Sequence, residues 1–302
     1  MKLGLVLKIA AAGLAAVLLT PLGVRGAVYW RSESYLHAVK IDPTGFDPAL
    51  SADPALLAHG RHVARTRGCF GCHGQNLEGA DFDEQWHWPQ RAVAPNLAAF
   101  IKTSDPAAFE AAVRQGVGAN GAALVSMPSY NFARLSNEDL GALYAFLRSA
   151  PVVKAELPAP ALGHAARRDL AHGAEIHMAA WADLVPELRV DPSAEPVRAR
   201  GEYLAMTMCN ECHGLDVRGQ TFYMPPTPDL AMVAALGRDE FERIITTGIG
   251  AGDRPLGLMR LVAPDRFPDL QDDEIDALYA YLASLAQEPV PDDVFWRPER
   301  GE

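Results

Sequence analysis

The four cysteines of this 302-residue chain form two Cys-x-x-Cys pairs, and a histidine directly follows each pair. The first motif runs from Cys69 to His73 and the second from Cys209 to His213. Two cysteines one helical turn apart can each add to a vinyl group of a porphyrin, which places the following histidine beneath the iron. The same spacing also serves thioredoxin-like redox pairs and halves of zinc sites. One motif alone therefore leaves three kinds of site open.

The repetition of the motif favours covalent haem. Both copies end in His-Gly, and together they use every cysteine of the chain. A zinc site would need the two pairs to converge, yet each pair lies in its own repeat unit. The sequence therefore predicts two covalently bound haem c groups with iron. Their attachment and proximal residues are Cys69, Cys72 and His73 in the first copy and Cys209, Cys212 and His213 in the second.

A methionine at a fixed distance downstream of each motif is the candidate sixth ligand. Met127 lies nine residues after Gly118, and Met259 lies nine residues after Gly250. Methionine usually fills gaps in a core, but here its position is repeated and follows a glycine-rich loop able to cover a haem face. The predicted metal ligands are His73, Met127, His213 and Met259. The other methionines of the second copy are interpreted as core or surface residues: Met206, Met208, Met224 and Met232.

Both motifs lie in longer repeated segments. Each copy continues with a Pro-Asn-Leu-like element, at residues 95–97 and 228–230, and closes with an apolar helix, at residues 140–147 and 275–282. A helix with a periodic apolar face is predicted before each cysteine pair, and the sequence has no alternating strand pattern of useful length. The predicted fold class is all-α, with two tandem small helical bundles.

These repeats predict a tandem pair of homologous domains. In chain order, the expected division is an N-terminal segment at 1–30, a linker at 31–50, a first domain at 51–150, a linker at 151–195, a second domain at 196–288 and a C-terminal tail at 289–302. The linker between the domains begins proline-rich, and a helix is possible in it from His164 to Leu184.

The N-terminal segment carries a membrane signal. An uncharged apolar run extends from Ile9 to Val24, and Lys2 and Lys8 precede it. As a helix this run would span about 24 Å, and continuing it to Trp30 would match a hydrocarbon core of about 30 Å. An uncleaved anchor is therefore expected, with a cleaved signal peptide as the alternative. With either an anchor or a signal peptide, the remainder of the chain is expected to be exported across the membrane.

Three features outside the motifs bear on the partners and on further candidate site residues. A formal net charge of −11 argues against a nucleic-acid partner and favours partners with basic surfaces. The first copy inserts residues 86–89 (Trp-His-Trp-Pro), which are expected to add hydrophobic cover, with partner docking as the alternative. Six histidines have no partner in the other repeat and are interpreted as surface or linker residues: His59, His62, His87, His164, His172 and His177.

Both repeats resemble class I cytochrome c domains. Each has an N-terminal helix leading into Cys-x-x-Cys-His, a Pro-Asn-Leu-like element, a distal methionine and a C-terminal helix. The whole chain resembles membrane-attached diheme cytochromes c of bacteria, many of which are electron-transfer subunits of periplasmic dehydrogenases. The resemblance implies that the carbonyl of Pro95 or Pro228 accepts a hydrogen bond from the motif histidine. One departure is that Arg260, rather than a proline, follows the second distal methionine.

The predicted ligands point to an electron carrier. An iron closed by histidine and methionine leaves no position for a substrate, so no catalytic residue is predicted. The expected partners are redox proteins: a periplasmic or membrane dehydrogenase, a terminal oxidase or a cytochrome bc complex. The expected location is the inner (cytoplasmic) membrane, with a single N-terminal span and the haem domains in the periplasm. Two alternatives stay open: a diheme enzyme of the peroxidase or thiosulfate dehydrogenase type, and a structural or sensory protein.

Overall fold

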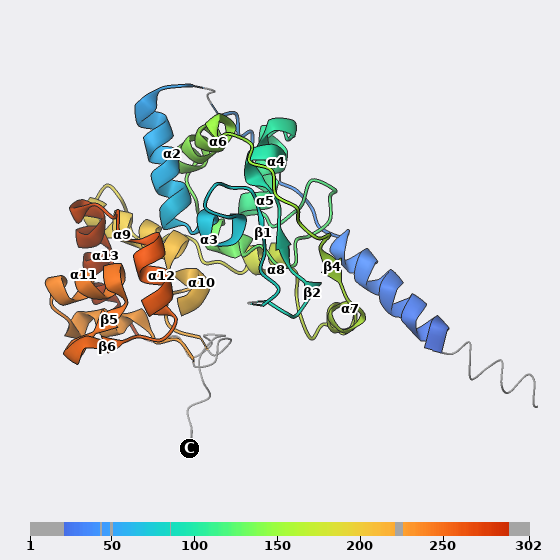
Figure 1. Ribbon diagram of the computed structural model, residues 1–302. Helices are drawn as coiled ribbons and strands as arrows, with labels where there is room; N and C mark the ends of the chain where they lie inside the picture. The colour runs from blue at the N-terminus through green and yellow to red at the C-terminus, as the bar shows by residue number, and fades with distance from the viewer. Residues whose placement is uncertain (1–20, 43, 49–50, 85, 221–225, 290–302) are drawn as a thin grey trace, which may run out of the picture.

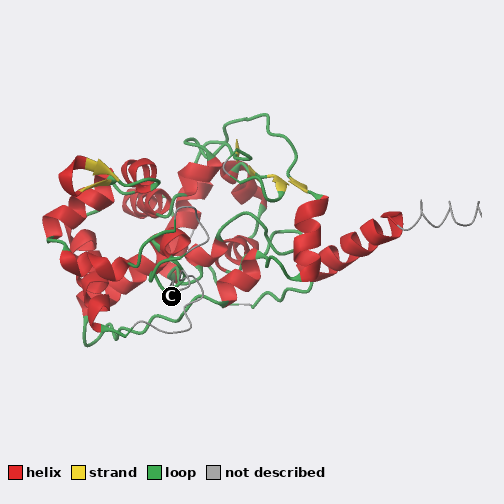
Figure 2. Cartoon of the chain, turned by 90° about the horizontal axis from the view of Figure 1, so that it is seen from below, coloured by secondary structure: helices red, strands yellow, loops and turns green. Residues whose placement is uncertain are grey.

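The computed structural model describes residues 21–42, 44–48, 51–84, 86–220 and 226–289 (Figure 1). Two helical bodies lie side by side, and helices dominate both of them in the turned view of Figure 2. The strands in the described ranges are two residues long and form three antiparallel pairs. The described part of the chain is therefore mostly helical, as the sequence predicts.

The first domain is built on two helices that cross closely. Its elements are α2 (Pro54–Thr66), α3 (Cys69–His73), β1 (Ala80–Asp81), β2 (Gln90–Arg91), β3 (Val93–Ala94), α4 (Leu97–Thr103), α5 (Pro106–Arg114), the 3-10 turn η1 (Ser129–Phe132) and α6 (Asn137–Ser149). Helix α2 crosses α6 at Gly60, where a Cβ atom would overlap the carbonyl oxygen of Ala142. Only glycine permits this approach, and it brings the buried Val63 of α2 into one core with Leu140 of α6.

The second domain repeats this crossing. Its elements are α9 (Pro196–Met208), α10 (Asn210–His213), η2 (Leu230–Ala235), α11 (Arg238–Thr247), β5 (Ile249–Gly250), η3 (Ala251–Asp253), β6 (Arg254–Pro255), α12 (Met259–Arg266), α13 (Asp272–Ser284) and η4 (Leu285–Gln287). A Cβ atom at Gly201 of α9 would overlap the carbonyl oxygen of Ala277 in α13. The helix before each motif is therefore held against the closing helix of its own domain in the same way.

The linker between the domains is folded onto the first domain. Its strand β4 (Ala161–Leu162) pairs with β2, next to the inserted residues of the first repeat. The single helix expected from His164 to Leu184 is wrong, because the chain forms two helices, α7 (His164–His172) and α8 (Met178–Asp183). The break follows from Gly173, which ends α7 in the left-handed conformation at φ 73°.

The described N-terminal residues form a helix over residues 21–36 that projects from the first domain (Figure 1). Near its end Val28 and Leu36 are buried, and the guanidinium of Arg167 in α7 lies 2.6 Å from the carboxylate of Glu33. The expected linker thus begins later than residue 31. Most of the predicted anchor, Ile9 to Val24, lies outside the described residues. Among the residues described, no helix is long and apolar enough to cross a membrane.

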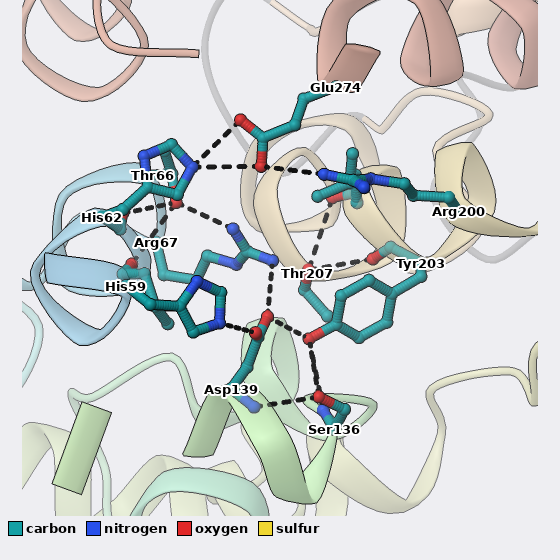
Figure 3. A network of polar contacts seen from close by, with 12 residues as sticks. His59, His62, Thr66, Arg67, Ser136, Asp139, Arg200, Tyr203, Thr207 and Glu274 are labelled. Atoms are coloured by element: carbon teal, nitrogen blue, oxygen red, sulfur yellow. Dashed lines mark hydrogen bonds and ion pairs between the residues drawn. The ribbon is translucent and has the colours of Figure 1, made fainter. Parts of the chain in front are cut away.

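The two domains meet through reciprocal polar contacts between equivalent residues (Figure 3). His62 of α2 lies 3.0 Å from a carboxylate oxygen of Glu274, the third residue of α13. In the reverse direction, the Tyr203 hydroxyl of α9 donates to Asp139, the third residue of α6, over 2.5 Å. The helix before the motif in each domain thus contacts the third residue of the closing helix in the other domain. Such reciprocal contacts are those of a dimer with two-fold symmetry.

These contacts correct the interpretation of the histidines. His62 joins the two domains, and His59 lies 2.7 Å from Asp139 within the first domain. His177 is buried and accepts a hydrogen bond from the backbone N–H of Ala180, which caps the start of α8. These side chains are structural. The repeat comparison missed the contacts of His59 and His62 because their partners lie on elements distant in the sequence, whereas His177 contacts the first turn of the helix it caps.

Candidate haem sites

Each motif occupies a single helical turn followed by the same tight loop. Helix α3 contains the first motif and α10 most of the second, so the two cysteines of each pair lie one turn apart. In both loops a buried non-glycine residue takes a left-handed conformation, with φ 61° at Leu77 and 56° at Val217. Such values are costly for a β-branched side chain. Their repetition indicates that the loop geometry serves the site.

The loops hold both motif histidines in one orientation. The Nδ1 of His73 lies 2.8 Å from the carbonyl oxygen of Pro95, and the Nδ1 of His213 lies 3.0 Å from that of Pro228. These are the hydrogen bonds that the resemblance implies. Because Nδ1 donates to a carbonyl, Nε2 is the nitrogen that can bind iron. Burial lowers the pKa of both imidazoles, so each is neutral at pH 7 and ready to act as a ligand.

The four thiols are held in their neutral form. Burial raises the pKa of Cys69, Cys209 and Cys212 to about 12, and it also raises the pKa of Cys72. Reactive redox cysteines have a lowered pKa, so these thiols do not resemble a redox-active pair. Within the described ranges, no three His, Cys, Asp or Glu residues are grouped so that they could hold a metal ion. The geometry therefore favours thioether attachment over a zinc site.

The two candidate distal methionines follow loops anchored in the same way. The N–H of Leu124 donates to the carbonyl of Gly116 over 2.7 Å, and the N–H of Leu256 donates to that of Gly248 over 3.0 Å. Met127 and Met259, each three residues further on, are partly buried against the core of their own domain. Their role as iron ligands stays a prediction.

The competing methionines of the second domain lie elsewhere. Met206 and Met208 are buried in α9, whereas Met232 is 52% exposed. Met224 lies outside the described residues. These positions agree with the interpretation of Met206, Met208 and Met232 as core or surface residues.

A cavity of about 370 Å³ opens beside Cys72. Its lining is mainly apolar and aromatic, and it reaches the start of the second-domain loop at Gly214 and Leu215. Trp86 and Trp88 of the inserted segment form part of the wall. This apolar and aromatic lining suits a flat porphyrin. Together with the two cysteine pairs and the two imidazoles oriented by proline carbonyls, the residues present fit a haem group.

Comparison with known proteins gives a family for both domains. The sequence profile of the family described as Cytochrome c matches residues 57–151 and 198–286. The gluconate 2-dehydrogenase cytochrome c subunit of Pantoea cypripedii is 27% identical over 295 residues, which cover 82% of this chain and 64% of that protein. The cytochrome c subunit of alcohol dehydrogenase (quinone) from Gluconobacter oxydans is 31% identical over 188 residues, covering 55% of this chain and 36% of that protein.

The name of a further relative also describes the cytochrome subunit of a dehydrogenase. The fructose dehydrogenase cytochrome subunit of Gluconobacter japonicus is 26% identical over 280 residues, covering 82% of this chain and 56% of that protein. The chain thus spans less than two thirds of the length of each of these three relatives.

Proposed function

The chain belongs to the cytochrome c family, and from this premise we propose that it is a diheme electron-transfer subunit that relays electrons from a dehydrogenase toward the respiratory chain. The relatives support this proposal, because their names describe cytochrome subunits of gluconate, alcohol and fructose dehydrogenases. The observation that carries it is the duplicated motif whose two histidines are oriented by the same proline carbonyl contact.

The residues of each domain would hold the haem and control its surroundings. When bound, haem supplies one-electron chemistry at the iron. In the first domain, Cys69 and Cys72 would fix the porphyrin and His73 would supply the proximal nitrogen, with Met127 as the distal ligand. Cys209, Cys212, His213 and Met259 would do the same in the second domain. Two protein ligands on each iron would exclude substrate and favour simple electron transfer.

We also propose that the haem domains lie in the periplasm and that the N-terminal segment holds them at the inner membrane. The support is the apolar run from Ile9 to Val24, together with the helix over residues 21–36 that joins the described domain directly to it. Retention of the native protein in washed membranes, and release into the periplasmic fraction when a cleavable signal peptide replaces residues 1–30, would support the anchor. A native protein found wholly in the soluble fraction, with a cleaved N-terminus, would contradict it.

The diheme proposal is tested by counting covalent haems. Intact mass and haem staining of denaturing gels should show two haem adducts in the native chain. Replacing Cys69 and Cys72 by Ala should leave one adduct, and so should replacing Cys209 and Cys212. Replacing only the neighbouring Met206 and Met208 by Leu is the control and should leave both. A native chain with one adduct, or with none, would contradict the proposal.

A further inference from the structure

One ion pair lies between the two haem-binding motifs. Arg266, the last residue of α12, lies 2.6 Å by its Nη1 from a carboxylate oxygen of Glu211. Glu211 stands inside the second motif, between Cys209 and Cys212. The Arg266 and Glu211 side chains are only 14% and 15% exposed, so solvent screens their charges weakly.

The same guanidinium also contacts the first motif. Gly68 directly precedes Cys69, and a Cβ atom placed on it would overlap the guanidinium carbon of Arg266 and lie 2.8 Å from its Nη2. On the neighbouring turn, the Arg65 guanidinium donates to the backbone carbonyl of Asp265 over 3.3 Å. The end of α12 is thus packed across the start of α3. Arg266 is therefore shared by a motif in each domain.

The reverse contact exists as well. Tyr130 follows Met127 in the first domain, and its backbone carbonyl accepts a hydrogen bond from the side chain of Asn210 over 3.3 Å. Asn210 is the residue after Cys209. The chain that follows each candidate distal methionine therefore packs on the motif of the other domain. Arg266 brings a positive charge to both motifs.

That charge lies against both motifs. The Arg266 guanidinium pairs with Glu211, between Cys209 and Cys212, and it also lies against Gly68, which directly precedes Cys69. A cation beside a haem favours the ferrous iron, because the ferric iron carries one more positive charge. A carboxylate has the opposite effect. A buried pair at this position is thus able to influence both irons.

We propose that Arg266 and Glu211 are positioning residues that jointly set the reduction potentials of both haems across the domain interface. This inference rests on the proposed diheme function. Neutralising Arg266 leaves the Glu211 carboxylate unopposed and lowers both potentials. Neutralising Glu211 leaves the cation unopposed and raises both. The double variant returns both potentials close to those of the native protein.

The test is a spectroelectrochemical titration of the purified holoprotein, resolved into two one-electron components. Arg266→Gln and Glu211→Gln should change the equilibrium constant of reduction by about tenfold in opposite directions, which is about 59 mV for a one-electron couple. Arg266→Lys should keep both reduction potentials close to the native values, since it keeps the positive charge. Arg238→Gln is the matched control, because this arginine of α11 forms an ion pair with Asp276 of α13 in the same domain. It should leave both potentials unchanged.

The outcomes separate the two proposals. A native protein without two haems contradicts the proposed function. With both haems present, a shift of only one component, or shifts of the same sign in both variants, overturns the role of this ion pair. Thermal unfolding of the same holoproteins provides a second readout. If Arg266→Gln proves too unstable to purify, Glu211→Gln still tests the sign of the effect, and Arg266→Lys tests whether a positive charge at this position is sufficient.

Discussion

The first and second domains each have a loop of the same conformation after the motif, but they differ in the chain around this loop. Leu77 and Val217 take the same left-handed conformation, and both motif histidines contact a proline carbonyl. Around the first loop, the inserted residues and the folded linker add β2, β4 and two tryptophans beside the cavity. His73 is buried, whereas His213 is partly exposed.

The chain after the distal methionine differs too. Met127 is followed by Pro128 and the 3-10 turn η1, whereas Met259 begins the longer helix α12. The difference teaches that the contact orienting each motif histidine is kept in both domains, while the chain after each candidate distal methionine differs. Because burial raises a haem potential, we expect the first-domain haem to have the higher potential.

The largest effects are expected from the distal methionines. Met127→Ala and Met259→Ala should each remove one thioether charge-transfer band near the red edge of the visible spectrum and lower the potential of that haem. Each variant should keep both covalent haems, bind carbon monoxide at the opened iron and lose about 2–5 kcal/mol of unfolding free energy, before the lost iron bond is counted. Carbon monoxide should reach the less covered second haem faster.

One result would show that the second ligand is assigned wrongly. If Met259→Ala leaves both haems six-coordinate with the thioether band intact, another residue binds that iron. Met224 and Met232 would then be the next variants to examine. Met206→Leu serves as the control, since this side chain is buried in α9.

Intermediate effects are expected where the paired helices cross. Gly60→Ala and Gly201→Ala should each destabilise their own domain by about 3 kcal/mol, because the added methyl overlaps a backbone carbonyl that cannot move aside. Equal losses in denaturant unfolding would confirm that both domains depend on this crossing. Gly141→Ala is the control, because its nearest neighbour would be Pro48 at 3.9 Å. A neutral result at either crossing would show that the helices can separate without loss.

The smallest effect concerns the acid sensitivity of the domain interface. Although burial raises it, the pKa of Glu274 is lowered on balance by its hydrogen bonds from His62 and Gln271. A carboxyl whose pKa is lower in the folded state stabilises the protein above its unfolded pKa of about 4.3, and this contribution is lost as the pH falls through the folded value. Glu274→Gln should therefore cost about 1 kcal/mol at pH 7 and progressively less below pH 4.

The matched control for this change is Asp273→Asn on the same helix turn. The Asp273 side chain is 66% exposed and pairs with Arg200 at the surface, so its loss should change unfolding very little. Urea unfolding from pH 3 to pH 7 measures both variants. Identical pH profiles for Glu274→Gln and the native protein would contradict the role given to His62.

Much of the candidate site could be predicted because it is local in sequence. The spacing from Cys69 to His73 places both thiols and the imidazole on one turn, and a single turn allows little variation. The closing helices expected from the apolar residues 140–147 and 275–282 are also local features, and the structure has them as α6 and α13. The repeat comparison added the matching positions of the two methionines, since two copies of one fold share their register.

Contacts between distant segments could be decided only by the tertiary structure. His62 and Glu274 are 212 residues apart, and nothing in the sequence pattern around either one indicates the other. Charged and imidazole side chains are usually solvated, so the sequence favoured a surface role for this histidine. The pairing depends on how two domains are oriented, which arises from their combined surfaces. For the same physical reason, only the folded chain shows that Arg266 of one domain lies against the motif of the other.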